Sequence, residues 1–244
     1  MKLLALGATA ALLTVHSAAL AQRPETPKGP AASATWTARD GWLIVGAERL
    51  FGLHVYSTTL NAGQGAKSEQ SGTMLSVFYG QSAINDDEDT VNPYAIPRIG
   101  ADIALGKGFT IGGNLGFGVS SGTRQSGDTE EELISVSSFA AYARFGYLIA
   151  LSESFAIWLR GGPEYYSTSH DDTEDGQVVT TVGFAAGLDP QLVITPAPHA
   201  AILLGPLIDL GIWGKTTRST ESNSVDAKTR SSSFGVTGGL ALIF

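Results

Sequence analysis

Histidines beside acidic residues are the arrangement in this sequence that comes nearest to catalytic chemistry. His170 is followed directly by Asp171 and Asp172, in a stretch rich in acids and poor in apolar residues. A histidine within reach of a carboxylate can act as a general base that activates water. Stretches of this composition are typically solvated loops, in which a histidine has the same neighbours and no catalytic role. We therefore predict that His170 is a loop residue.

Serine beside histidine would offer a second kind of chemistry. A hydrolase that acts on acyl lipids needs a serine and a histidine activated together near the lipid boundary. His54 with a serine of a neighbouring strand would meet this requirement, but serine is so frequent here that no particular pair stands out. His199 falls in a predicted tight turn, where we expect a structural role. The sequence thus predicts no enzyme and no catalytic residue.

Ligands for a metal or a cofactor are equally hard to assemble. The stretch from Asp171 to Gly176 begins like a calcium-binding loop, with oxygen-bearing side chains followed by glycine. Val182 stands where such a loop requires a bidentate glutamate, so the match fails. The chain has no cysteine, which excludes a thiolate site and a disulfide framework. We predict no cofactor and no defined metal site, and only diffuse binding of divalent cations by acidic loops.

Acidic residues are concentrated in three short clusters. The formal net charge is −8, and 12 of the 23 acids lie in the clusters at residues 86–89, 128–132 and 171–175. All three clusters fall in turn-forming stretches, which predicts solvated loops. Because phosphate groups would be repelled by such loops, nucleic acid is excluded as a partner.

Alternation of apolar and polar residues with a period of two dominates the chain from about residue 42 onward. It predicts strands that are separated by tight turns and by long polar loops in turn. The predicted strands cover residues 42–57, 95–106, 109–121, 133–150, 154–169, 177–195, 200–217 and 229–244. Residues 72–81 do not fit: they belong either to a long external excursion over 58–94 or to a ten-stranded barrel, and the eight-stranded form is favoured.

Charged residues interrupt one face of these strands and spare the other. In 177–195, for example, one face carries Phe184 and Leu192 while the opposite face carries Gly187 and Asp189. A charge that faces lipid near the bilayer midplane costs about 2–4 kcal/mol, so a lipid-facing stripe must be nearly free of ions. The nearly balanced signs of the charges, and the small residues beside them, indicate that they point inward and pair. We predict an interior polar cluster of Glu48, Arg98, Asp102, Arg144, Arg160, Glu164, Asp189, Asp209 and Lys215.

Two features disagree with a regular barrel. Arg49 falls on the apolar side of the first strand, where only a bulge would turn it away from lipid. Prolines within strands remove ladder donors, so we expect bulges or ladder breaks at Pro97, Pro163, Pro190 and Pro206.

The beginning of the chain has the features of an export signal. Residues 1–21 combine a positive start at Lys2, an apolar run and a small-residue triplet that ends at Ala21. This anatomy predicts a secretory signal peptide that is cleaved before Gln22. The proline-containing residues 22–40 predict an extended periplasmic linker, and residues 41–244 form the predicted barrel domain.

The last predicted strand ends in alternating apolar residues and a terminal aromatic, Phe244. This segment resembles the closing strand of outer-membrane β-barrels, and Phe244 resembles the C-terminal signal by which the insertion machinery recognises them. In pattern, residues 42–244 are similar to the small OmpA-like or OmpX-like barrels. The resemblance implies an all-β fold, namely a closed antiparallel up-and-down transmembrane barrel in the outer membrane of a Gram-negative cell. It carries over no residue of known function.

Omptin-type barrel proteases offer a second comparison. They use surface Asp and His pairs, whose counterpart here would be His170 with Asp171 and a second acid at Asp86 or Asp87. Omptins are longer, and nothing else of their pattern is present in the sequence. A protease is therefore not predicted.

These features predict a non-enzymatic outer-membrane protein with a structural or surface-interaction role. Its partners would be outer-membrane lipid, lipopolysaccharide and the barrel-insertion machinery, with divalent cations at the acidic loops. In one alternative the inward ions line a narrow, porin-like solute pore, although a plug is favoured. In the other, a soluble periplasmic lipocalin-like barrel binds an apolar ligand.

Overall fold

The described part of the chain is the predicted barrel domain. The computed structural model describes residues 41–63, 66–78, 80–83, 92–126, 129–172, 177–220 and 223–244. The predicted signal peptide 1–21 and linker 22–40 lie outside these residues, as does the acidic cluster at 86–89. Among the described residues, no helix is long and apolar enough to cross a membrane.

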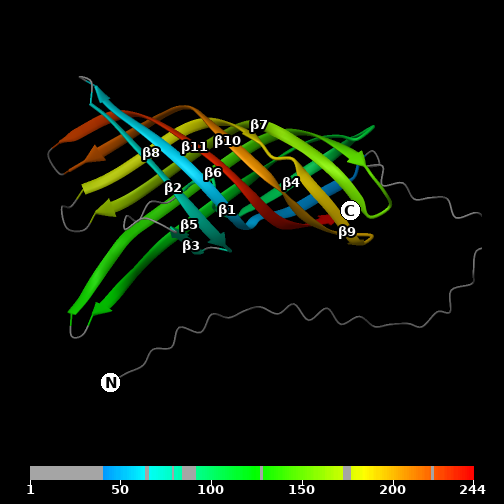
Figure 1. Ribbon diagram of the computed structural model, residues 1–244, viewed down its shortest axis with the longest axis horizontal. Coiled ribbons are helices and arrows are strands. Elements are labelled where there is room, and N and C mark those ends of the chain that lie inside the picture. The colour runs from blue at the N-terminus through cyan, green and yellow to red at the C-terminus, as the bar shows by residue number, and fades with distance from the viewer. Residues whose placement is uncertain are drawn as a thin grey trace, which may run out of the picture. The chain divides into compact units, whose positions relative to one another are not determined.

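Antiparallel strands make up almost all of this region (Figure 1). Residues that alternate in polarity suit extended backbone, because successive side chains of a strand point to opposite faces. The strands are β1 Leu43–Gly63, β2 Ala66–Val77, β3 Gly80–Ala83, β4 Arg98–Gly106, β5 Phe109–Ser126, β6 Thr129–Ala150, β7 Phe155–Asp172, β8 Gln177–Leu188, β9 Gln191–Ala197, β10 Ala200–Ser219 and β11 Ser224–Ile243.

The strands close into a ring with eight wall positions. Pairing runs from β1 through β4, β5, β6 and β7, continues through β8 and β9 to β10 and β11, and returns from β11 to β1. β8 and β9 share one wall position, since each pairs with β7 on one side and with β10 on the other. The prediction of an eight-stranded closed antiparallel barrel is confirmed.

β2 and β3 are not members of the closed ring, and they form the excursion expected between residues 58 and 94. β1 pairs with β4 only from Leu43 to Glu48, and from Phe51 onward its partner on that side is β2. β3 then pairs with the end of β2 at Val77. The strand pattern at residues 72–81 therefore belongs to this excursion and not to a ten-stranded ring.

Prolines account for several irregularities in the ladders. Pro190 separates β8 from β9, and the pairing of β6 with β7 lapses beside Pro163. Pro97 precedes β4, which begins at Arg98, so residues 95–97 are not part of the strand predicted there. The expected break at Pro206 is found on one side only. β10 keeps its register with β11 through this residue, while its pairing toward β8 and β9 is absent opposite Pro190.

Tight connections lie at one end of the ring. In the turn between β4 and β5, Lys107 and Gly108 have φ angles of 50° and 88°, a region that glycine adopts freely. β11 returns to the same end, where Leu43 and Phe244 exchange backbone hydrogen bonds of 3.1 and 2.9 Å. Bacterial barrels carry short turns on the periplasmic side and long loops outside, so this is the periplasmic end.

Large apolar side chains point out of the barrel and charged side chains point in. Ile99, Phe145 and Phe117 are 72%, 66% and 62% exposed, whereas Arg144 and Asp209 are 1% and 0% exposed. Such a surface is unfavourable in water and suits contact with hydrocarbon. The soluble lipocalin-like alternative is wrong, because it requires the opposite arrangement.

Candidate functional site

Five charged side chains from five wall positions of the ring meet inside the barrel, and we call them the Glu48 cluster. Its members are Glu48 of β1, Asp102 of β4, Arg144 of β6, Arg160 of β7 and Asp189, which follows β8. Arg144 donates from Nη1 and Nη2 to the two carboxylate oxygens of Glu48 at 2.6 and 2.7 Å, and Arg160 Nη1 donates to Glu48 Oε1 at 2.8 Å. Asp102 accepts from Arg144, and Asp189 accepts from Arg160. Each arginine thus binds two carboxylates, the arrangement that buried guanidinium groups require.

A second group, the Arg49 cluster, consists of Arg49, Arg98, Glu164 and Asp209. Arg98 Nη2 donates to Glu164 Oε1 at 2.5 Å. Arg49 lies between the two acids, with Nη1 at 3.3 Å from Asp209 Oδ2 and Nη2 at 3.7 Å from Glu164 Oε2. Tyr94 adds a neutral acceptor, since its backbone carbonyl accepts from Arg49 Nη1. All four charged side chains are buried.

Arg49 reaches the interior because the backbone of β1 is irregular at this point. Its φ is 53°, and the register of β1 with β11 shifts between Ala47 and Phe51. A bulge reorients the side chain that it carries. Arg49 therefore turns away from the apolar face on which regular alternation would place it.

Eight of the nine predicted cluster residues lie in these two groups, and Lys215 does not. The Lys215 side chain is exposed and its Nζ is 2.9 Å from Asp226 Oδ2. The registers of β10 shift between Gly211 and Trp213 and between Asp209 and Lys215. Because of this irregularity, Asp209 points inward and Lys215 points outward, although both have odd numbers. The placement of Lys215 in the interior is wrong for that reason.

An apolar floor closes the interior on the periplasmic side of the Glu48 cluster. Trp158 is its largest member, and its indole Nε1 donates to Thr110 Oγ1 at 3.0 Å. The guanidinium carbons of Arg160 and Arg144 lie 4.5 and 5.7 Å from the Trp158 ring centroid, within the range of cation–π attraction. The floor consists of Ile44, Ala104, Leu148, Ala156, Trp158, Val193, Ala201, Leu203, Ala241 and Ile243.

The sequence interpretation missed this floor. It assigned the inward face to small and polar residues, whereas the inward face turns apolar near the periplasmic turns. The available signal was the apolar residues on the inward face close to strand ends, such as Leu148, Leu203 and Ile243.

Residues 92–97 lie inside the barrel toward the external end. Tyr94 Oη donates to the backbone carbonyl of Ser231 at 2.9 Å, and Asn92 Nδ2 donates to Ser233 Oγ at 3.3 Å. The Tyr94 ring also packs edge-on against Tyr166 at 5.1 Å. The segment therefore covers the Arg49 cluster from the external side, and its carbonyl groups contribute to that cluster.

The space beside Glu48, where the two clusters adjoin, is very small. A cavity of about 10 Å³ lies beside Glu48, Arg49, Arg160 and Asp189. About 10–15 Å³ is the least that holds one water molecule. The side chains of the Glu48 cluster, with Arg49 beside them, thus leave room at this point for one water molecule at most.

His54 and Ser76 are brought together, but in the interior. His54 Nε2 lies 3.3 Å from Ser76 Oγ, and Ser76 Oγ also lies 3.4 Å from the carbonyl of Gly52. Both side chains are fully buried, and His54 Nδ1 has no hydrogen-bond partner among the described residues. A serine nucleophile needs a base that is itself oriented by a third group and a route for substrate. This pair has neither the orienting contact nor access to lipid.

Metal ligands do not gather in the described part of the chain. No group of three His, Asp or Glu side chains there could hold a metal ion. His170 and Asp171 belong to β7 near its external end, so the prediction that His170 is a loop residue is wrong. Asp86 and Asp87 lie outside the described residues. Of the residues that the comparison with omptins pairs, the structure therefore describes His170 and Asp171 but not the second acid.

Aromatic side chains gather at two levels of the outer surface. The outer aromatic belt contains Phe139, Tyr165, Phe184 and Trp213, with neighbouring ring centroids 5.3 to 6.3 Å apart. Near the periplasmic turns, Phe109 and Tyr147 pack at 4.9 Å. Phe139 and Tyr147 are eight positions apart on β6. That spacing corresponds to about 26 Å along the strand and to about 20 Å of height at a tilt of about 40°, close to the apolar band of a membrane barrel.

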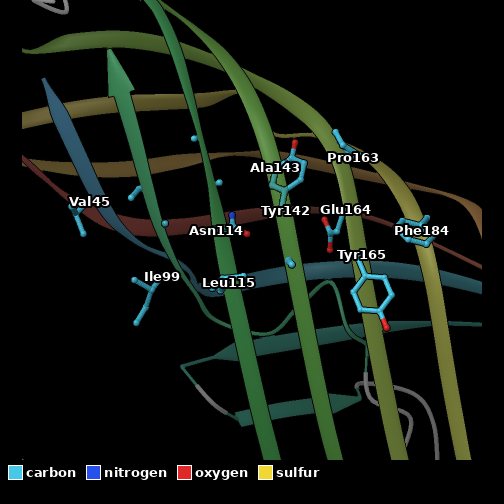
Figure 2. A pocket seen from close by; sticks show the side chains of 15 residues that line it. Val45, Ile99, Asn114, Leu115, Tyr142, Ala143, Pro163, Glu164, Tyr165 and Phe184 are labelled. Atoms are coloured by element: carbon cyan, nitrogen blue, oxygen red, sulfur yellow. The ribbon is translucent and has the colours of Figure 1, made fainter. Parts of the chain in front are cut away.

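A shallow groove lies within this band (Figure 2). Its volume is about 590 Å³, and small outward residues such as Ala101, Gly113 and Ala143 form its bottom between Ile99 and Phe184. The wall is thin here because the outward side chains are short. The groove faces outward, on the apolar surface of the barrel.

Comparison with known proteins gives similarity in structure alone. No family model matches the chain, and no curated protein matches its sequence. The chain is similar to the outer membrane protein OprG from Pseudomonas aeruginosa, at 13% identity and a TM-score of 0.46, over 84% of this chain and 97% of that chain. It is similar to the outer membrane protease OmpT from Escherichia coli, at 8% identity and a TM-score of 0.48, over 85% and 98% of the two chains. For Neisserial surface protein A the identity is 11% and the TM-score 0.37, over 84% and 100%.

The geometry itself decides the architecture. A closed ring of strands carries an apolar band between the outer aromatic belt and the pair Phe109 and Tyr147, and nine charged side chains are buried within the ring. In a bilayer every backbone polar group must be paired, and a closed barrel satisfies this requirement. The chain therefore has the architecture of an outer-membrane β-barrel.

Proposed function

We propose that this protein is a non-conducting outer-membrane barrel with a structural or surface-interaction role. One observation carries the proposal: the nine charged side chains of the Glu48 and Arg49 clusters span the lumen, and none is more than 4% exposed. A charged ring that conducts ions must stay open to water. Here the charges face one another.

The interior supports a plug because its charges are already paired. Each arginine of the two clusters contacts at least one carboxylate within 4 Å. Removing one partner of such a buried pair leaves an uncompensated charge, so opening a path would cost several kcal/mol. The floor around Trp158 adds an apolar barrier that hydrated ions do not cross.

Surface interaction is proposed from the external end. The β5–β6, β7–β8 and β10–β11 hairpins extend beyond the outer aromatic belt, and they carry the acidic stretches at 128–132 and 171–175. Most of those acids lie outside the described side chains. We propose lipopolysaccharide and divalent cations as partners at these loops, and the barrel-insertion machinery as the partner during assembly.

Planar-bilayer recording tests the plug against the narrow pore. The purified barrel should give no discrete conductance steps, while an open porin in the same bilayer gives them. Arg160→Gln should also remain silent, because the Glu48 cluster retains Arg144 and the floor is unchanged. Regular steps from the wild type, with ion selectivity altered in Arg160→Gln, would establish the pore instead.

A further inference from the structure

Three basic side chains lie together on the outer face of β10 and β11. Lys215, Lys228 and Arg230 are all exposed. The residues that directly follow them, Thr216, Thr229 and Ser231, are buried and point inward. Thr216 Oγ1 lies 2.8 Å from Thr181 Oγ1 and hydrogen-bonds to Thr229, and Ser231 Oγ lies 3.0 Å from Thr58 Oγ1. Side chains alternate between the two faces of a strand, so the three cations face away from the lumen.

These cations lie just beyond the outer aromatic belt. Lys215 follows Trp213 of that belt by two residues, and Arg230 precedes the exposed Phe234 by four residues. Interfacial aromatic residues mark the boundary between hydrocarbon and headgroups. Residues a few positions beyond them toward the loops therefore lie at the level of the outer-leaflet headgroups.

The cluster carries more positive charge than its surroundings neutralise. Lys215 and Lys228 are direct cross-strand partners, an arrangement that is destabilising for like charges. Asp226 pairs with Lys215 and accepts from Thr217 Oγ1 at 2.8 Å. Among the described residues, no carboxylate lies within ion-pair distance of Lys228 or Arg230. Three cations and one anion thus leave a net charge of about +2 in a chain whose formal charge is −8.

We propose that Lys215, Lys228 and Arg230 bind the phosphate group of a phosphorylated glycolipid in the outer leaflet. Lysine and arginine are the side chains that bind phosphate most strongly, by charge and by multiple donors. The apolar surface directly below, at Trp213, Phe234 and Val236, would contact the acyl chains of the same molecule. This inference rests on the proposed outer-membrane placement, and it concerns the barrel wall and not the acidic loops.

Native mass spectrometry of the refolded full chain in detergent micelles tests the site. The probes are bisphosphorylated lipid A, its dephosphorylated form and inorganic phosphate. We expect retention of bisphosphorylated lipid A, with affinity lower by about tenfold or more in Lys228→Gln/Arg230→Gln, because a charge-assisted hydrogen bond contributes about that factor. Arg218→Gln is the matched control. It removes the same charge from β10, but at a position on the opposite face of the strand, and it should bind like wild type.

Each outcome has one meaning. Equal retention by Lys228→Gln/Arg230→Gln and wild type, or equal retention of the dephosphorylated lipid, overturns the proposed site. Equivalent binding of inorganic phosphate alone overturns its assignment to a glycolipid. Heat-modifiable gel migration of every variant shows that the barrel has folded. If the wild type stays soluble without detergent, the outer-membrane proposal itself has failed, which is distinct from failure of the site.

Discussion

Glu48 and Arg144 form a bidentate ion pair across the barrel interior between residues that are 96 positions apart in the chain. Glu48 also accepts from Arg160, so one carboxylate joins β1 to β6 and β7. A buried pair of this kind contributes little net stability relative to apolar residues of equal shape, but breaking it is costly. The pair therefore fixes which walls face each other.

Substitution of Glu48 by Gln should destabilise the barrel by about 3–5 kcal/mol, because Arg144 and Arg160 lose the negative charge that they share and one of its two acceptor oxygens. Urea unfolding in detergent micelles measures the change. Glu69→Gln is the control, since it makes the same substitution in the exposed pair with Lys67. Exposed pairs contribute about 0–1 kcal/mol, so equal losses in the two variants would contradict a buried network.

Replacement of Trp158 by Ala should cost about 3–5 kcal/mol, the usual range for a large aromatic in a packed core. Trp158→Phe retains most of the floor but loses the hydrogen bond to Thr110, and its loss should be smaller. Thermal unfolding followed by gel migration compares the two. If Trp158→Ala unfolds at the same temperature as the wild type, the floor does not stabilise the barrel.

Glycines in the wall should differ sharply in their tolerance of alanine. A Cβ at Gly205 would lie 2.0 Å from the carbonyl oxygen of Pro190, whereas at Gly118 the nearest atom, on Ile96, is 3.5 Å away. We expect Gly205→Ala to lower the yield of heat-modifiable barrel and Gly118→Ala to leave it unchanged. Refolding yield on gels is the readout, and a normal yield for Gly205→Ala would show that the backbones separate there easily.

Charge on the outer face should be tolerated according to depth. Ala143 lies midway between Phe139 and Tyr147 on β6, while Ser137 lies on the same face beyond the outer aromatic belt. We expect a cost of about 2–4 kcal/mol for Ala143→Arg and of about 0–1 kcal/mol for Ser137→Arg. Folding titrations in phospholipid vesicles measure both. Equal losses of stability in Ala143→Arg and Ser137→Arg would show that the membrane boundary does not lie at the outer aromatic belt.

Phe244 is proposed to be recognised during insertion. Its ring is exposed, and its backbone pairs with Leu43. Phe244→Ser should slow assembly in cells while leaving the purified, refolded barrel about as stable as wild type, because the backbone pairing does not need the ring. Phe155→Ser, at another exposed aromatic near the periplasmic turns, is the control. Normal assembly of Phe244→Ser in cells would remove the proposed signal.

The strands and the outward apolar faces could be predicted from sequence because both are periodic. Alternation specifies an element and its two faces without any knowledge of its neighbours. The same rule misplaced Lys215, since it assumes an unbroken period along β10. Arg49 shows the converse case, in which a shift in register brings an apparent outward charge into the interior.

Features that depend on the third dimension were harder to predict. The floor around Trp158 is built from ends of several strands, and each strand contributes only one or two residues to it. The sequence pattern assigned residues 95–97 to a strand. In the structure, Asn92 and Tyr94 of the segment 92–97 contact Ser233 and Ser231, which lie 141 and 137 positions later in the sequence. The floor leaves only scattered apolar residues at inward positions near strand ends, and the contacts of residues 92–97 leave no local pattern in the sequence.

The seam between β1 and β11 has a consequence for how the barrel forms. Ile44 pairs with Ile243, and the pairing extends, past the shift in register between Ala47 and Phe51, to Asn61 and Lys228. Every other wall joint connects strands that are closer in sequence, so closing this joint carries the largest loss of chain entropy. The seam can be completed only after the last strand has been synthesised. Until then the curved sheet has two unpaired margins, and these need protection from association with other chains.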